Sequence, residues 1–112
     1  MRVNTEIIYQ QKANSVIDYI SSNLHESLDL SIIASRICVS KRQMLRIMKI
    51  YLNEPLSAYL RRQRLERAVM YMQTEKTGLE KLAAMVGYDN SQSFSKAFKK
   101  HFGISPKNYL NI

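Results

Sequence analysis

Hydrophobic residues recur along this chain at intervals of three and four, the spacing that places them on one face of an α-helix. The first such stretch covers about residues 5–24, and its stripe consists of Ala13, Val16, Ile17, Ile20 and Leu24. Further stretches cover about residues 41–52, 56–73 and 91–102. The pattern predicts amphipathic packing helices over these four ranges.

Start signals in the first half of the chain predict where two helices begin. Asp29 is a good N-cap residue and precedes a short apolar segment that runs to Ile37. Ser40 is followed three residues later by Gln43, the arrangement of a capping box. We therefore expect a short helix after Asp29 and a longer one from about residue 41.

Similar signals occur in the second half. Thr77, Gly78 and Glu80 precede a short apolar segment, and they suggest a second capping arrangement. Ser105 stands directly before Pro106, and proline is favoured at the first position of a helix. These signals predict a short helix from about residue 79 and a last one from Pro106.

The chain repeats itself when it is compared with its own sequence. At an offset of 49, Leu30 matches Leu79, Ala34 matches Ala83 and Cys38 matches Gly87; at an offset of 50, Met44 matches Phe94, Met48 matches Phe98, Lys49 matches Lys99 and Tyr59 matches Tyr109. One residue inserted in the second copy accounts for the change of offset. Each copy has a short helix, a small residue, a tight turn and a longer helix, which is the order of a helix-turn-helix.

Composition agrees with a helical chain and points to a polyanionic partner. With 46% hydrophobic residues, 3 glycines and 2 prolines in 112 residues, an all-α globule is expected. The net charge is +8, but residues 1–30 carry −2 (two basic, four acidic) and residues 31–112 carry +10 (15 basic, five acidic). Nucleic acid is therefore the leading candidate partner and an anionic membrane surface the second.

Several classes of protein are not expected. The single cysteine, Cys38, excludes an intrachain disulfide and a zinc cluster, and we expect it to be a small buried residue. No basic-then-apolar leader and no apolar run of about 18 residues appear, so cytoplasm is the expected compartment. No carboxylate pair, nucleophile–base set or glycine-rich phosphate loop is present, and we expect neither an enzyme nor a cofactor.

Advancing by about 100° per residue separates two faces on each longer helix. Over 41–52 the inward residues are Met44, Ile47, Met48 and Tyr51, and the outward ones Arg42, Leu45, Arg46 and Lys49. Over 91–102 the inward residues are Phe94, Ala97, Phe98 and His101, and the outward ones Gln92, Ser95, Lys96 and Lys99. Neither outward face carries an acidic residue, although a merely solvated basic face remains the alternative.

The outward side chains suit the edges of DNA bases. Arg42 and Arg46 can bind guanine O6 and N7, Gln92 can pair with adenine, and Leu45 can contact a thymine methyl group. The remaining candidates for base contacts, which could also reach phosphates, are Gln43, Ser91, Ser95 and Lys96. The candidates for phosphate contacts, which would orient the protein, are Ser40, Lys41, Lys49, Lys99 and Lys100.

Four stretches of the second copy stand together: Gly87–Asp89, Ser93–Lys100, Gly103–Pro106 and Tyr109. They closely resemble the signature of the AraC/XylS family, and Tyr59, Arg64, Leu65 and Ala68 are similar to its linker helix. The resemblance covers roughly residues 8–111. The first copy departs from it, with Cys38 where glycine is frequent, Met48 where phenylalanine is usual and Asn53 where glycine commonly ends the helix.

The resemblance implies a domain of about seven helices over residues 1–112. A long linker helix (about 55–73) would join two homeodomain-like helix-turn-helix lobes (about 8–54 and 74–112), whose recognition helices enter adjacent major-groove segments of double-stranded DNA. It places Arg42, Gln43, Leu45 and Arg46, and then Ser91, Gln92, Ser95 and Lys96, at base-reading positions. It also implies a bacterial transcription regulator, mostly an activator that engages RNA polymerase, usually with a separate sensing or dimerisation domain.

Two other functions remain open at this stage. The basic faces could dock an acidic partner protein as part of a helical interaction module. Alternatively, the chain could bind DNA as an architectural protein without sequence preference, for which lysine should outnumber hydrogen-bonding side chains on the reading faces. The mixed Arg, Gln and Ser content of these faces favours sequence-specific binding.

Overall fold

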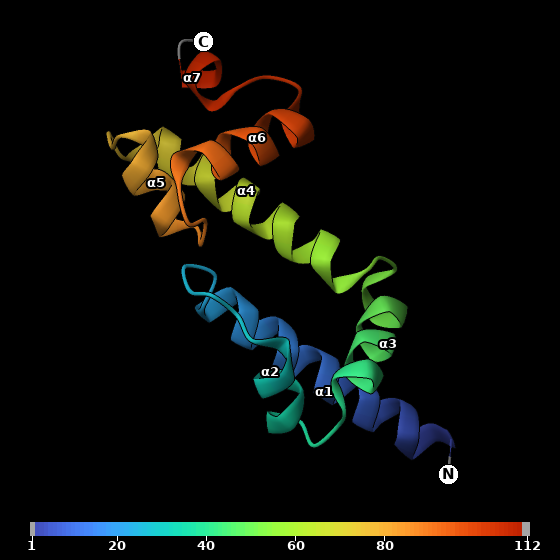
Figure 1. Cartoon of the computed structure of the whole chain (residues 1–112). Helices are drawn as coiled ribbons and strands as arrows, with labels where there is room; N and C mark the ends of the chain where they lie inside the picture. Colours follow the sequence, from blue (N-terminus) through green and yellow to red (C-terminus); the bar gives the residue numbers. More distant parts are fainter. Residues whose placement is uncertain (1, 111–112) are drawn as a thin grey trace. The chain divides into compact units, whose positions relative to one another are not determined.

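The structure is a computed structural model that describes residues 2–110, and this range holds seven α-helices and no strand. They are α1 (Arg2–Ser22), α2 (Leu30–Arg36), α3 (Lys41–Leu52), α4 (Leu56–Thr74), α5 (Leu79–Met85), α6 (Ser91–Phe102) and α7 (Pro106–Leu110) (Figure 1). The chain forms two compact units. The first unit is the chain up to Asn23 with Leu28–Leu60, and the second unit is Leu24–Ser27 with the chain from Arg61 onward. The expected all-α fold with about seven helices is confirmed.

In the first unit, α1 and α2 both pack against α3. The stripe predicted on α1 supplies part of the core, because Ala13, Val16 and Ile20 are buried. The other helices of this unit complete the core with Ile33, Ala34, Met44, Ile47, Met48 and Leu56. Tyr51, expected inward, is exposed instead, and its hydroxyl donates a hydrogen bond of 2.9 Å to the backbone carbonyl of Glu6.

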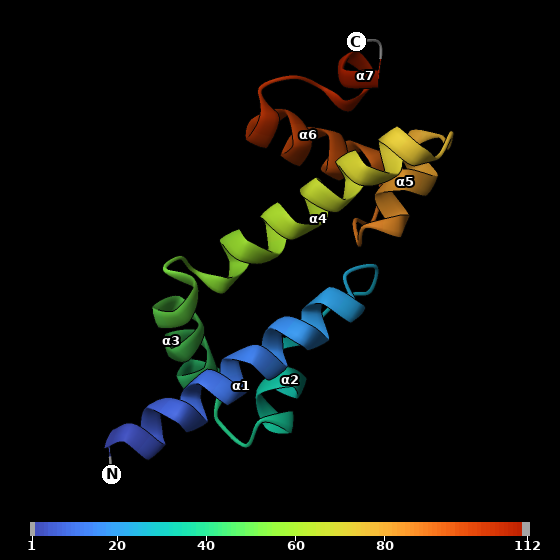
Figure 2. The same cartoon turned by 180° about the vertical axis from the view of Figure 1, so that it is seen from behind.

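The second unit has an aromatic core. Its core cluster consists of the buried residues Leu65, Ala68, Leu82, Ala83, Val86, Phe94 and Phe98. The part of α4 from Arg61 onward lies beside α5 and α6 in both views (Figures 1 and 2). His101, expected on the inward side, is exposed at the end of α6, where its ring contacts that of Phe102.

The two copies share one backbone plan in spite of their different sequences. α2 and α5 each have seven residues and are offset by 49, while α3 and α6 each have 12 residues and are offset by 50. The turn between the helices runs from residue 37 to residue 40 in the first copy and from 86 to 90 in the second. The predicted inserted residue therefore lies in the second turn.

The capping predictions are confirmed only in part. Asp29 caps α2, and Ser40 accepts a hydrogen bond from the backbone N–H of Gln43 at 3.0 Å. Gln43 does not return the bond; its Nε2 donates a hydrogen bond to the hydroxyl of Tyr9. Gly78 is the N-cap residue of α5 and makes no side-chain cap bond, so the second capping box was wrong. Asn90, which the sequence signals missed, caps α6.

Left-handed residues occupy equivalent places in both copies. Cys38 has φ 61° and Gly87 has φ 92°, while Asn53 and Gly103 end α3 and α6 with φ 57° and 85°. The helix end expected at Asn53 is confirmed. Cys38 is exposed rather than buried, because this turn lies at the surface of the first unit.

We expect Cys38→Gly to stabilise the first unit. A non-glycine residue with a left-handed backbone costs about 1–2 kcal/mol, whereas glycine costs roughly 0.5–1 kcal/mol in chain entropy. The free energy of unfolding should therefore rise by about 0.5–1 kcal/mol, measured by urea unfolding under reducing conditions. Cys38→Ala, which keeps a Cβ atom, is the matched control and should give no such gain.

Residues Leu24–Ser27 belong to the second unit and close one side of it. Leu24 is 1% exposed, and Nη2 of Arg64 donates a 3.0 Å hydrogen bond to the carbonyl of Glu26. Burial lowers the pKa of Arg64 and raises the pKa of the neighbouring Tyr88. Both pKa shifts indicate that water is partly excluded from this side of the unit.

Candidate nucleic-acid interface

The outward face of α3 combines cationic groups with one apolar side chain. Met44, Ile47 and Met48 fix the inward side of this helix, so the residues between them are turned away from the core. A shallow hollow on the outward side is lined by Lys41, Arg42, Leu45, Arg46 and Lys49. Five of the predicted contact residues are therefore brought together on one surface.

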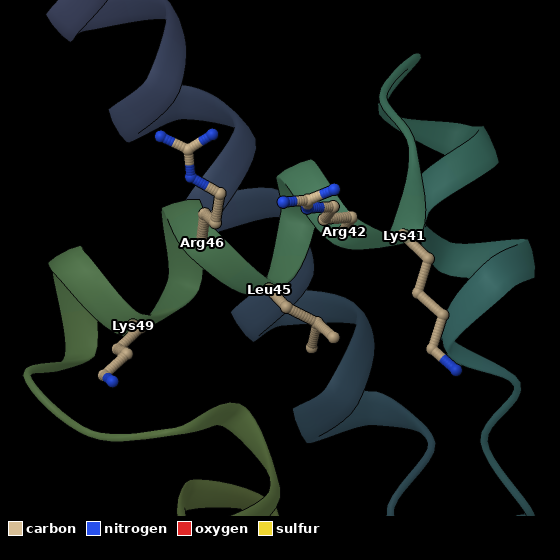
Figure 3. A pocket seen from close by; sticks show the side chains of 5 residues that line it. All are labelled: Lys41, Arg42, Leu45, Arg46 and Lys49. Atoms are coloured by element: carbon tan, nitrogen blue, oxygen red, sulfur yellow. The ribbon is translucent and has the colours of Figure 1, made fainter.

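Figure 3 shows how these five side chains are arranged. The side chains of Arg42 and Arg46 lie on one side of the group, Leu45 projects toward the other side, and Lys41 and Lys49 lie toward the two ends. Leu45 is half-buried, and the four basic residues are exposed. The face thus offers two guanidinium forks beside one apolar side chain, with an ammonium group toward each end.

Gln43 is placed differently from the other candidates on α3. Its Nε2 donates a 3.4 Å hydrogen bond to the hydroxyl of Tyr9 on α1. It lines a second hollow, of about 270 Å³, whose walls are Glu6, Tyr9, Gln43, Arg46, Ile47, Ile50 and Tyr51. Gln43 is half-buried there, whereas Arg46 borders both hollows. The hydroxyl oxygen of Ser40, the N-cap residue, accepts a hydrogen bond from the backbone N–H of Gln43.

The outward face of α6 is basic and hydrophilic. Phe94 and Phe98 are fully buried and orient the helix. The predicted contact residues Gln92, Lys96, Lys99 and Lys100 are exposed, and Ser95 is half-buried. This face has no counterpart of Leu45, because Ser95 stands at the equivalent position.

Ser91, the first residue of α6, is engaged by an acidic residue from α5. Its hydroxyl donates a 2.6 Å hydrogen bond to Oε1 of Glu80, and its backbone N–H lies 3.4 Å from the same oxygen. The sequence predicted outward faces without acidic residues because each longer helix was considered alone. That prediction missed Glu80, which comes from α5. The sequence did contain a signal for this contact. Glu80 lies in the short helix before α6, and the short turn between the two helices keeps Glu80 near the start of α6.

Other kinds of site find no support within residues 2–110. No group of three or more His, Cys, Asp or Glu side chains that could hold a metal ion occurs in this part of the chain. Among the helices described, none is long and apolar enough to cross a membrane. The two basic helix faces therefore remain the features that call for a functional explanation.

Comparison with known proteins gives a consistent result. A family model described as "Helix-turn-helix domain" matches residues 33–112. The HTH-type transcriptional regulator ArgR of Pseudomonas aeruginosa is 36% identical over 101 residues, which cover 89% of this chain and 30% of ArgR. The chain spans less than half the length of the first curated relatives that it matches.

Solved structures show the same fold. A transcriptional regulator from Chromobacterium violaceum, described as containing an AraC-type DNA-binding domain, matches with TM-score 0.82 and 28% identity, covering 91% of each chain. The DNA-binding domain of AdpA, solved in complex with a target DNA, matches with TM-score 0.83 and 22% identity, covering 88% of this chain and 89% of that one. The expected homeodomain-like helix-turn-helix architecture is confirmed, and the relatives are regulators rather than enzymes.

Proposed function

The chain belongs to the AraC/XylS family of sequence-specific DNA-binding transcription regulators, and from this premise we propose which of its residues read DNA and how. The outward faces of α3 and α6 enter adjacent major-groove segments of double-stranded DNA. The observation that carries this proposal is the outward face of α3, where two arginines and a leucine line one hollow and no acidic side chain does.

The α3 face reads bases through three side chains. Arg42 and Arg46 each present a planar fork of donors that fits O6 and N7 of guanine. Leu45 lines the same hollow and contacts the methyl group of thymine. Gln43 reaches a base only by giving up its bond to Tyr9, so we expect its contribution to be smaller than that of these three side chains.

The α6 face reads a different pattern. Gln92 is exposed and can pair with N6 and N7 of adenine. Ser95 and Lys96 follow on the same face and contact bases or phosphates, and Ser91 lies at the start of the helix. Because the two faces differ in chemistry, we expect the two halves of the DNA site to differ in sequence.

A third group orients the protein on the DNA backbone. Lys41, Lys49, Lys99 and Lys100 are exposed and contact phosphates, and Ser40 contributes from the N-cap of α3. Phosphate contacts release counterions, so affinity falls with salt, with a logarithmic slope of about −0.9 for each phosphate neutralised.

The proposal for the wider role is based on the family rather than on the geometry. We propose that the domain comprises lobes at about residues 8–54 and 74–112 with a linker over 55–73. It acts in the cytoplasm of a bacterium as a transcription activator, engages RNA polymerase, and works with a sensing or dimerisation domain outside residues 1–112. No cofactor is required for DNA binding.

A selection from a random DNA library, followed by titration of the selected duplex, tests the proposal. Arg42→Ala and Arg46→Ala should each cost about 1–3 kcal/mol on the selected site and relax base preference at one position. Lys99→Ala is the matched control: it should weaken binding to all sequences alike and reduce the salt slope by about 1.

Three results would contradict this assignment. Selection of no motif with tight binding to any duplex would indicate an architectural protein, and failure to bind DNA would favour docking to an acidic protein. If the arginine variants lost the same affinity on random DNA as on the selected site, both arginines would be phosphate contacts.

A further inference from the structure

The pair formed by Glu80 and Ser91 places a carboxylate at the start of the helix that faces DNA. Ser91 is the first residue of α6, and Glu80 lies on the exposed side of α5. The separation of 2.6 Å between the serine hydroxyl and Oε1 is typical of a charge-assisted hydrogen bond. The carboxylate is therefore held in place rather than free to move in solvent.

This pairing changes what Ser91 can do. A hydroxyl has a single proton to donate, and here that proton is directed at Glu80. Ser91 therefore cannot donate to a base while the pair persists. The ionised carboxylate keeps further lone pairs, and all of them are acceptors. The group that this end of α6 offers to DNA is an acceptor.

The first unit has the opposite chemistry at the equivalent place. By the offsets of 49 and 50, Ser31 corresponds to Glu80 and Lys41 corresponds to Ser91. The first unit therefore has a cation at the first position of α3 and no carboxylate at the position that corresponds to Glu80. A carboxylate repels phosphate, so general attraction to the DNA backbone does not explain its presence.

We propose that Glu80 is a specificity-determining residue, which accepts a hydrogen bond from the amino group of cytosine, and that Ser91 is its positioning residue. The inference rests on the proposed binding of α6 in the major groove. Cytosine presents only the N4 amino donor there, whereas guanine and thymine present acceptors that an anion repels. Adenine offers an amino group beside the N7 acceptor and is the second choice.

Selection from a random library with the wild-type chain and with Glu80→Gln tests this inference. The glutamine is nearly isosteric and can still bond Ser91, so folding should be unchanged by circular dichroism. We expect the wild-type motif to contain a cytosine that Glu80→Gln no longer requires, with discrimination at that position falling on the order of 5- to 150-fold. Preference at the positions read by α3 should stay the same.

Two further variants separate positioning from charge. Ser91→Ala should keep cytosine as the preferred base but weaken the preference, because the carboxylate is no longer held. Glu75→Gln removes the same charge from an exposed residue between α4 and α5, and it should leave the motif unchanged.

The outcomes distinguish this inference from the function on which it rests. If the wild type selects no motif, the proposed base reading fails and the role of Glu80 fails with it. If wild type and Glu80→Gln select the same motif with equal discrimination, base reading stands and the role of Glu80 is overturned. Equal weakening on every sequence, together with a lower melting temperature, would make the pair purely structural and would also overturn the inference.

Discussion

Gly87→Ala is expected to lower the free energy of unfolding of the second unit by about 2–6 kcal/mol. The backbone at Gly87 has φ 92°, which costs an L-residue roughly 1–3 kcal/mol. An added Cβ atom would also lie 2.2 Å from the carbonyl oxygen of Leu24 and 2.9 Å from Nε of Arg64. The oxygen belongs to the backbone of a residue that is 1% exposed, so it cannot move aside, and such overpacking adds about 1–3 kcal/mol.

The other two glycines provide matched controls for this prediction. Gly103 has φ 85° but nothing within 4 Å of an added Cβ atom, so Gly103→Ala should show the backbone strain alone. Gly78 has φ −70° and open space, so Gly78→Ala should cost only about 0.5–1 kcal/mol, because alanine is a poorer N-cap residue than glycine. Urea unfolding followed by circular dichroism measures all three. Equal losses for Gly87→Ala and Gly103→Ala would mean that Leu24 does not approach Gly87 closely.

The sequence predicted the helices well because their signals are local. Hydrophobic spacing and the residues at the N-caps Asp29 and Ser40 depend on the neighbouring few residues, and both helix starts were predicted correctly. The repeat also predicted the extra residue in the second turn. Helix bounds, turn lengths and left-handed positions follow from short stretches of chain, so a sequence contains the information that fixes them.

Side-chain placement was harder because it depends on partners distant in the sequence. Gln43 bonds Tyr9, which is 34 residues away, and no spacing rule links the two. Tyr51 and His101 occupy inward positions by helical angle, but each is the last residue but one of its helix and is exposed. Glu80 reaches Ser91 across a turn, so considering one helix at a time could not reveal the pair.

The aromatic core of the second unit makes Phe98→Ala the other substitution with a large expected effect. Phe98 is fully buried, and its ring centroid lies 5.7 Å from Phe94, 4.6 Å from Phe102 and 5.9 Å from Tyr109. Removing a buried phenylalanine ring costs about 3–5 kcal/mol, because the cavity left behind collapses only in part. That loss is a large fraction of the 5–15 kcal/mol typical of small domains.

The same substitution should affect DNA binding through one helix rather than through the net charge. Phe98 lies on the side of α6 opposite Gln92 and Lys96. Loss of the Phe98 ring therefore leaves the DNA-contacting side chains in place in the sequence but lets α6 shift on its core. On the selected duplex, Phe98→Ala should lose discrimination at the positions read by α6 and keep it at those read by α3. Phe102→Ala, at a ring that is 37% exposed, is the matched control and should cost far less stability and leave the motif intact. If Phe98→Ala instead abolished discrimination at both sets of positions equally, α3 could not read DNA without the second unit, and the two helix-turn-helix units would have to act as one.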